Sequence, residues 1–193
     1  MKLNTFSKNI TVNLALSGMM AALVFVATMF FKVQIPVAGD KTMLGFANVF
    51  CILSGLLLGP VYGGLAAGIG SCLFDLVGGW ATSAPVTLVT KFMMAFLCGL
   101  ITWGGSGSAK KLSRVIAGAV TGSLAYCALY IGYSWLKMAV LGSAWQAINI
   151  QLSVKIPVTL INAVLADVIA VPLFFAVRNA LRRNHLLFRS LHA

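Results

Sequence analysis

The chain alternates between long apolar stretches and short polar or glycine-containing connections. A membrane-spanning helix needs about 20 mostly apolar residues, and most of the stretches approach or exceed that length. The apolar runs are continuous, whereas the strands of a membrane barrel would alternate with a period of two. We therefore predict an all-α membrane protein, a six-transmembrane-helix bundle that forms a single membrane domain over residues 1–193. The predicted spans are 10–31, 44–58, 60–78, 85–103, 113–136 and 153–177.

The second and third spans are separated only by Gly59-Pro60. Glycine is favoured just after a helix and proline at the first position of the next one, so this dipeptide predicts a break. A single kinked helix of about 35 residues, at about 1.5 Å per residue, would overrun the bilayer. We therefore predict two helices, the first of them short.

Composition supports membrane insertion and argues against a nucleic-acid partner. Hydrophobic residues make up 60% of the chain and charged residues 9%, with a net charge of +11, and the mean hydropathy is +0.98. A soluble domain cannot bury so much apolar surface. The basic residues gather at the ends of the apolar stretches instead of forming one basic face. We therefore expect the chain to contact the lipid bilayer of the cell membrane and no nucleic acid.

The distribution of lysine and arginine predicts the orientation. Nine basic residues lie on the side that holds both termini, and four lie on the opposite side. Because cytoplasmic connections carry the excess of basic residues, both termini are predicted to be cytoplasmic. The outward connection 32–43 is long enough to fold over a cavity mouth as a lid. The larger set is Lys2, Lys8, Lys110, Lys111, Arg114, Arg178, Arg182, Arg183 and Arg189, and the smaller set is Lys32, Lys41, Lys137 and Lys155.

Two ionisable residues at membrane depth are the first candidates for a functional site. Asp75 lies near the outer end of the third span, and Lys91 lies about 9 Å inside the outer end of the fourth. Such groups are costly in the membrane and usually face protein or a water-filled cavity. One interpretation is an ion pair that bridges the two helices. The other is that Lys91 contacts a ligand and that Asp75 holds it in place.

Further polar residues lie on the fourth and sixth spans. Thr87 and Lys91 share a helix face with Met94 and Cys98, which we expect to look into the bundle. Asp167 lies mid-way along the sixth span. We identify no basic residue at its depth, so it is either protonated, hydrogen-bonded or facing a cavity.

Aromatic residues gather toward the outer side. Tyr126, Tyr130 and Tyr133 share one face of the fifth span. They fit either an interfacial aromatic belt or a stacking platform for a ring-containing ligand. Trp80 and Trp145, in other outward connections, either close the same site or anchor the interface.

No catalytic or metal-binding set is recognisable in the sequence. The four cysteines lie inside apolar stretches without metal-ligand spacing, which indicates packing residues. There is no nucleophile elbow, zinc-protease motif or phosphate-binding loop. We therefore expect no enzymatic activity, no cofactor and no metal. If the chain takes part in energised transport, the ATPase must lie on another polypeptide.

Small residues recur at four-residue spacing, which lets helix backbones approach closely. In the first span, Gly18-x-x-x-Ala22 forms such a patch and is a candidate surface for another subunit.

Together these motifs resemble the substrate-binding S component of energy-coupling factor (ECF) vitamin transporters. The resemblance covers most of the chain and is strongest in the second to fourth spans. Its residues are Leu44-Gly45-Phe46, Leu58-Gly59-Pro60-Val61-Tyr62-Gly63-Gly64, Ala67-Gly68-Ile69-Gly70, Asp75-Leu76-x-Gly78 and Lys91.

The resemblance implies a subunit that captures a vitamin with high affinity from outside the cell. It also implies a transmembrane coupling protein, docked at Gly18 and Ala22, and two ATP-binding cassette subunits. Gly18 departs from the alanine that is more usual at its position in the family. The ligand would lie near the outer side, among Lys91, Thr87, Trp80, the three tyrosines and the start of the sixth span with Lys155, Pro157 and Asn162.

The ligand itself is left open by the sequence. Lys91 and Lys155 suit a carboxylate such as pantothenate or folate, and the tyrosines suit a flat ring such as a flavin or pterin. Two other classes of function remain as alternatives: a multispanning membrane enzyme acting on a lipid or isoprenoid, and a small channel or structural membrane subunit.

Overall fold

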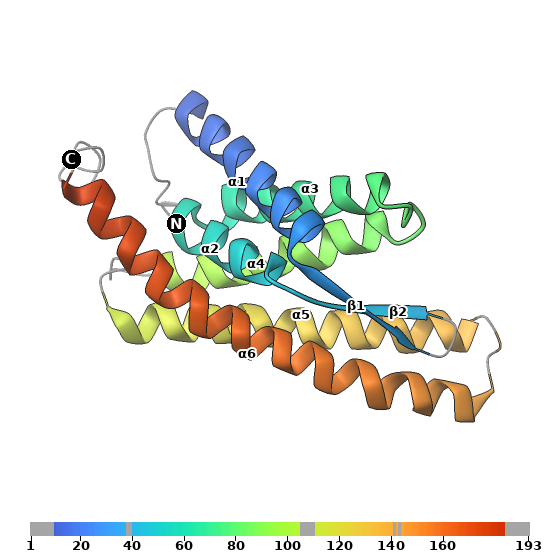
Figure 1. Cartoon of the computed structure of the whole chain (residues 1–193). Coiled ribbons are helices and arrows are strands. Elements are labelled where there is room, and N and C mark those ends of the chain that lie inside the picture. Colours follow the sequence, from blue (N-terminus) through green and yellow to red (C-terminus); the bar gives the residue numbers. More distant parts are fainter. Residues whose placement is uncertain (1–9, 38–39, 105–110, 141, 143, 184–193) are drawn as a thin grey trace.

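The structure, a computed structural model, describes residues 10–37, 40–104, 111–140, 142 and 144–183. The described chain consists of six helices and one small two-stranded sheet (Figure 1). The helices are α1 (Ile10–Phe30), α2 (Ala47–Leu58), α3 (Pro60–Val77), α4 (Ala84–Trp103), α5 (Leu112–Val140) and α6 (Trp145–Arg183), and the strands are β1 (Lys32–Val37) and β2 (Asp40–Gly45).

Five of the six helices in the described part of the chain are long and apolar enough to cross a membrane. They are α1, α3, α4, α5 and α6, and many of their large apolar side chains are exposed on the outside of the bundle. Contact of such apolar side chains with lipid is favourable, whereas their exposure to water is unfavourable. The chain is thus a multi-pass membrane protein.

The expected second span differs from the others. With 12 residues, α2 is about 18 Å long at helical rise, which is too short to cross a hydrocarbon core of about 30 Å. The helix is instead surrounded by protein, because it packs against each of the other five helices. Figure 1 shows it in the middle of the bundle. Its largely apolar sequence therefore reflects burial in protein on all sides.

The break between α2 and α3 lies where the sequence predicts it. Gly59 has a positive φ of 81°, a backbone conformation that costs glycine little and other residues more. Pro60 then starts α3. The turn packs closely against α4, because a Cβ on Gly99 would lie 2.6 Å from the backbone carbon of Gly59. Residue 99 therefore has no room for a side chain.

The connection after α1 is a β-hairpin and not an irregular loop. Strands β1 and β2 pair in antiparallel register, from Lys32 opposite Gly45 to Val37 opposite Asp40. The sequence from Lys32 to Val37 places an apolar β-branched residue at every second position, a period typical of a strand. The sequence analysis described residues 32–43 only as an outward connection and did not use this alternation. The all-α prediction holds for the bundle and omits this hairpin.

The last two helices are longer than expected. α5 continues to Val140, and α6 begins at Trp145 and contains both Pro157 and Pro172. The start of α1 and the end of α6 lie at one end of the bundle, and the hairpin lies at the other (Figure 1). The end of α5 and the start of α6 also lie at the hairpin end (Figure 1). The extra helical turns therefore extend the bundle at that end.

Candidate functional site

A pocket opens at the hairpin end of the bundle. It contains about 1120 Å³ of empty space, part of it open to solvent at the mouth. All six helices and both strands contribute to its walls. Eight residues expected from the sequence to lie around a ligand line it, and so does Asp75, whereas Pro157 is not part of the lining. The eight residues are Lys91, Thr87, Trp80, Tyr126, Tyr130, Tyr133, Lys155 and Asn162.

Lys91 joins three helices inside the pocket. Its ammonium donates a hydrogen bond to Oδ1 of Asn48 on α2 and lies 3.9 Å from the ring centre of Tyr126 on α5. The side chain is only 7% exposed. A ring face and an amide oxygen each stabilise a cation without neutralising it. The pocket therefore holds a lysine side chain whose terminal nitrogen is fixed in place by neutral partners.

The face of α4 that carries Lys91 points inward, as its spacing predicts. Met94 and Cys98 are fully buried on this face. Thr87 and Lys91 line the pocket, whereas Met94 and Cys98 belong to the hydrophobic core. On this face of α4, Thr87 and Lys91 therefore line the pocket, and Met94 and Cys98 pack in the core.

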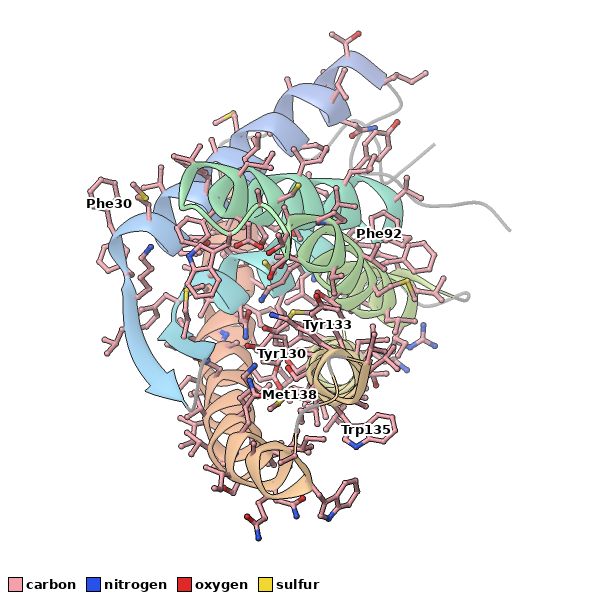
Figure 2. The ribbon with its side chains drawn as sticks, turned by 90° about the vertical axis from the view of Figure 1, so that its right-hand side faces the viewer. Phe30, Phe92, Tyr130, Tyr133, Trp135 and Met138 are labelled. Carbon is pink, nitrogen blue, oxygen red and sulfur yellow. The ribbon has the colours of Figure 1, made fainter. Side chains whose placement is uncertain are left out.

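The three tyrosines of α5 line the pocket wall. The rings of Tyr126 and Tyr130 are stacked, with centres 5.6 Å apart and planes 18° apart. Figure 2 shows Tyr130 and Tyr133 pointing from α5 into the interior, while Trp135 points away on the other side. Trp135 is 44% exposed. Of the two interpretations left open by the sequence, the tyrosines fit the pocket wall, and Trp135 fits the interfacial belt.

Lys155 places a second ammonium in the same wall. Its Nζ donates to Oγ of Ser134 on α5 at 3.3 Å and lies 5.6 Å from the ring centre of Tyr130. Lys155 is 2% exposed. Lys155 lies on α6 just before Pro157, and this helix begins eight residues earlier than the sequence predicts.

Asp75 lies on the α3 side of the pocket. Its hydrogen-bonding neighbour is Thr87, and both Lys91 and Lys32 lie within electrostatic range of its carboxyl group. The direct hydrogen-bond partner of Lys91 is Asn48, so the contact of Lys91 with Asp75 is of the longer-range kind. Lys32 itself lies over the ring of Phe74, 4.1 Å from its centre.

Asn162 has a structural contact that the sequence did not predict. It lines the pocket, but both ends of its side-chain amide bond to the backbone of β2. The amide nitrogen donates to the carbonyl of Met43 at 2.6 Å, and the amide oxygen accepts from the N–H of Gly45 at 3.0 Å. The side chain therefore ties the hairpin to α6.

Several pocket residues were not identified from the sequence, notably Asn48, Lys32 and Ser134. The signal for Asn48 was a lone amide in an otherwise apolar stretch, which in a membrane calls for a partner. Lys32 and Ser134 had no signal beyond their closeness to the ends of the first and fifth spans.

Three residues singled out in the sequence lie outside the pocket lining: Gly18, Ala22 and Trp145. Gly18 and Ala22 are exposed on α1, and nothing lies within 4 Å of the position that a Cβ on Gly18 would occupy. Trp145, one of the two tryptophans considered for closing the site, starts α6 and is 67% exposed. Trp80, the other, lines the pocket.

Asp167 has a defined partner in the structure. The hydroxyl of Ser123 on α5 donates to Oδ1 of Asp167 at 2.8 Å, so the hydrogen-bonded alternative describes it. Among the described residues, no three histidine, cysteine, aspartate or glutamate side chains come together as a metal site.

Comparisons with known proteins agree with the architecture. The model of the family described as ECF-type riboflavin transporter, S component, matches residues 8–179. A solved structure described as the S component of a bacterial ECF transporter has a similar fold, with a TM-score of 0.64 and 20% sequence identity, and the match covers 90% of this chain and 99% of that one. A protein of Pyrococcus woesei, named only as uncharacterized, is 31% identical over 104 residues, which are 54% of this chain and 67% of that protein.

Proposed function

Because the chain belongs to the ECF-type riboflavin transporter S component family, we propose that it captures a vitamin or related micronutrient in the pocket at the hairpin end. As a member of this family it is a transport subunit and not an enzyme, which sets aside the alternative of a membrane enzyme acting on lipids. The resemblance deduced from the sequence is thereby confirmed. We further propose in which pocket the ligand binds and which residues bind it.

The observation that carries the proposal is the pocket itself. Small-molecule sites are concave, have largely apolar walls and contain a few well-placed polar groups. Here aromatic rings of Tyr126, Tyr130 and Tyr133 form one wall, and Lys91 is fixed among them by Asn48. A channel would need an open path through the bundle, whereas α2 and the hydrophobic core around it fill the centre beneath this pocket.

The ligand candidates follow from the family and the lining. The family model names riboflavin, and the three tyrosines suit its flat ring. Folate adds carboxylates to a flat ring, and pantothenate carries a carboxylate without a ring. We propose that the ligand contacts Lys91, Thr87, Trp80, Lys155 and the three tyrosines, while Asn162 contributes by holding the hairpin.

The orientation in the membrane belongs to the same proposal. The basic residues predict that both termini are cytoplasmic. In the structure, the start of α1 and the end of α6 lie at the end of the bundle away from the hairpin (Figure 1). With this orientation the pocket faces outward and receives its ligand from the external medium.

Uptake would require partners that supply energy. We propose that a transmembrane coupling protein docks on the open face of α1 at Gly18 and Ala22, and that two ATP-binding cassette subunits act through it. Support comes from the exposure of this small-residue patch, since such patches permit close helix contact.

A titration of the purified chain tests the capture function. Riboflavin, folate and pantothenate are added to the detergent-purified protein, and binding is followed by calorimetry and by the melting temperature. A ligand that binds only the folded protein raises the melting temperature. We expect saturable one-to-one binding without turnover and without ATP. Ion conductance of the reconstituted chain without ligand binding would instead support the channel alternative.

A further inference from the structure

Some of the hydroxyl groups that line the pocket have already used their hydrogen atoms. Thr28 on α1 donates to the carbonyl of Val24 at 2.6 Å, and Thr90 on α4 donates to the carbonyl of Thr87 at 3.2 Å. Both threonines line the pocket. A hydroxyl has one hydrogen to donate and two lone pairs that accept. Toward a ligand, these two side chains therefore act as hydrogen-bond acceptors.

The carboxyl group of Asp75 adds a stronger acceptor. Asp75 is 5% exposed and lines the pocket. The hydroxyl of Thr87 is its hydrogen-bonding neighbour, and this hydroxyl donates, because an ionised carboxyl group only accepts. Thr87 thereby becomes a third threonine whose hydrogen is used. A carboxylate has about four lone-pair positions, so the bond from Thr87 leaves positions for donors of a ligand.

Two lysines lie within electrostatic range of Asp75, and their closest described contacts are with other groups. The terminal nitrogen of Lys91 donates to Asn48, and that of Lys32 lies 4.1 Å from the ring centre of Phe74. Basic neighbours lower the cost of a carboxylate at membrane depth. The contacts with Asn48 and Phe74 use neither oxygen of Asp75, so the carboxyl group can accept hydrogen bonds from a molecule that enters the pocket.

Helix packing brings these acceptors together. A Cβ on Gly70 of α3 would lie 3.0 Å from the Cβ of Val24 on α1, so the two helices are in close contact there. Thr28 and Asp75 follow this contact by about one turn on their own helices, and the bond from Thr87 adds α4. We call this set of pocket-lining side chains the acceptor corner: Thr28, Asp75, Thr87 and Thr90.

We propose that the acceptor corner binds a part of the ligand that carries hydrogen-bond donors, either a hydroxylated chain or an amino-substituted ring edge, and that Asp75 determines this specificity. This inference rests on the proposed capture function and narrows it. A ligand that placed methyl groups or acceptors here would desolvate the carboxyl group without donating to it, which is costly. The tyrosines of α5 remain available to a flat ring.

Two matched pairs of probes test the inference. Lumiflavin has the ring of riboflavin with a methyl group in place of the hydroxylated chain, and lumazine has the ring of pterin with a carbonyl in place of the amino group. Calorimetric titration of the purified chain compares the members of each pair. Within a pair that binds, we expect the member with more donors to bind at least about tenfold more tightly, because hydrogen bonds to a charged group are the stronger ones. The pair that shows the difference identifies the donors as those of a chain or of a ring edge.

A variant of nearly the same shape connects the preference to the carboxyl group. Asp75→Asn replaces one acceptor oxygen by an amino group that donates. We expect the two members of the pair to bind this variant with similar affinity, through weaker binding of the member with more donors. The affinity for lumiflavin or lumazine should change far less, which also shows that the variant is folded. Asp167→Asn is the matched control, because Asp167 also lies within a helix but outside the pocket lining, and it should retain the preference.

Each other outcome has a distinct meaning. If lumiflavin and lumazine bind as tightly as riboflavin and pterin, or if Asp75→Asn keeps the preference, the inference is wrong and the capture function stands. If folate or pantothenate binds and neither pair does, that vitamin is titrated into Asp75→Asn. A loss of about tenfold or more then supports the inference, and an unchanged affinity overturns it. If no probe binds to the folded protein, the capture function fails, and the inference fails with it.

Discussion

The ammonium of Lys91 on α4 donates its hydrogen bond to the side-chain oxygen of Asn48 on α2, 43 positions earlier in the chain. This contact connects the central helix to the pocket and directs a buried cation toward the tyrosines of α5. The acceptor is a neutral amide oxygen, so this contact forms no ion pair with Lys91. Lys91 and Asn48 thereby place a hydrogen-bonded amine beside the tyrosines of α5.

Replacing the neutral acceptor by an acid should compete with the ligand. In Asn48→Asp, a carboxylate of nearly the same shape would pair with Lys91 and offset its charge. We expect the affinity for an acidic probe such as folate or flavin mononucleotide to fall about tenfold or more, without a lower melting temperature. Calorimetric titration measures the affinity, and differential scanning fluorimetry measures the melting temperature. Asn149→Asp, at an exposed position of α6, is the control, and equal affinities in the two variants would contradict the assignment.

Releasing the hairpin should accelerate ligand dissociation. Asn162→Ala removes the bonds to the carbonyl of Met43 and the N–H of Gly45, which together are worth about 1–3 kcal/mol. We expect faster amide exchange at Gly45 and a higher ligand dissociation rate in stopped-flow measurements. Asn149→Ala, on the same helix and outside the pocket lining, should leave both rates unchanged. Slow exchange at Gly45 in Asn162→Ala would show that other contacts hold the hairpin.

Blocking the open face of α1 should separate capture from uptake. Gly18→Leu places a bulky side chain where a Cβ meets nothing within 4 Å, so the chain itself should fold and bind ligand normally. Uptake in cells that also produce the coupling protein and ATPases should be lost, because close helix contact needs small residues. Gly132→Leu is the matched control, since Gly132 on α5 is also unobstructed. Normal uptake by Gly18→Leu would exclude this face as the docking surface.

The close contact between α4 and the turn after α2 should be intolerant of any side chain. In Gly99→Ala, the added Cβ would lie 2.6 Å from the Pro60 nitrogen and 2.8 Å from its Cα, and backbone atoms cannot move aside easily. We expect a loss of about 1–3 kcal/mol of stability, seen as a lower melting temperature in detergent. Gly132→Ala should be neutral or stabilising, because alanine favours the helix where space is open. A melting temperature of Gly99→Ala equal to that of the wild-type protein would mean that α4 can shift outward.

Much of the site could be predicted from local patterns. The spacing of Tyr126, Tyr130 and Tyr133 places them on one helix face in any helical structure, and the structure puts that face in the pocket. Lys91 was identifiable because a charged residue inside an apolar span needs a polar environment. Both predictions depend only on helix geometry and on the cost of charge in a membrane.

The partners of these residues were not predictable in the same way. Asn48 and Asn162 meet Lys91 and β2 across more than forty positions of sequence, and no local pattern specifies such pairs. The sequence led us to expect that Asn162 contacts the ligand, yet its amide is occupied by the hairpin backbone. The structure also assigns Asp167 a partner, Ser123, which sequence reasoning could not select among the polar residues of the neighbouring helices.

By itself, the sequence determined that this chain is a helical membrane protein with charged and aromatic residues toward one end of its bundle. It could do so because lipid cannot satisfy exposed backbone groups, which forces apolar stretches to form helices. Three features emerge only from the tertiary structure: α2 is enclosed by the other helices, Lys32–Val37 and Asp40–Gly45 pair as strands at the pocket, and Lys32, Lys91, Lys137 and Lys155 line the same pocket. These features depend on which helices pack together, and small residues such as Gly99 permit many pairings that only the complete set of contacts can distinguish.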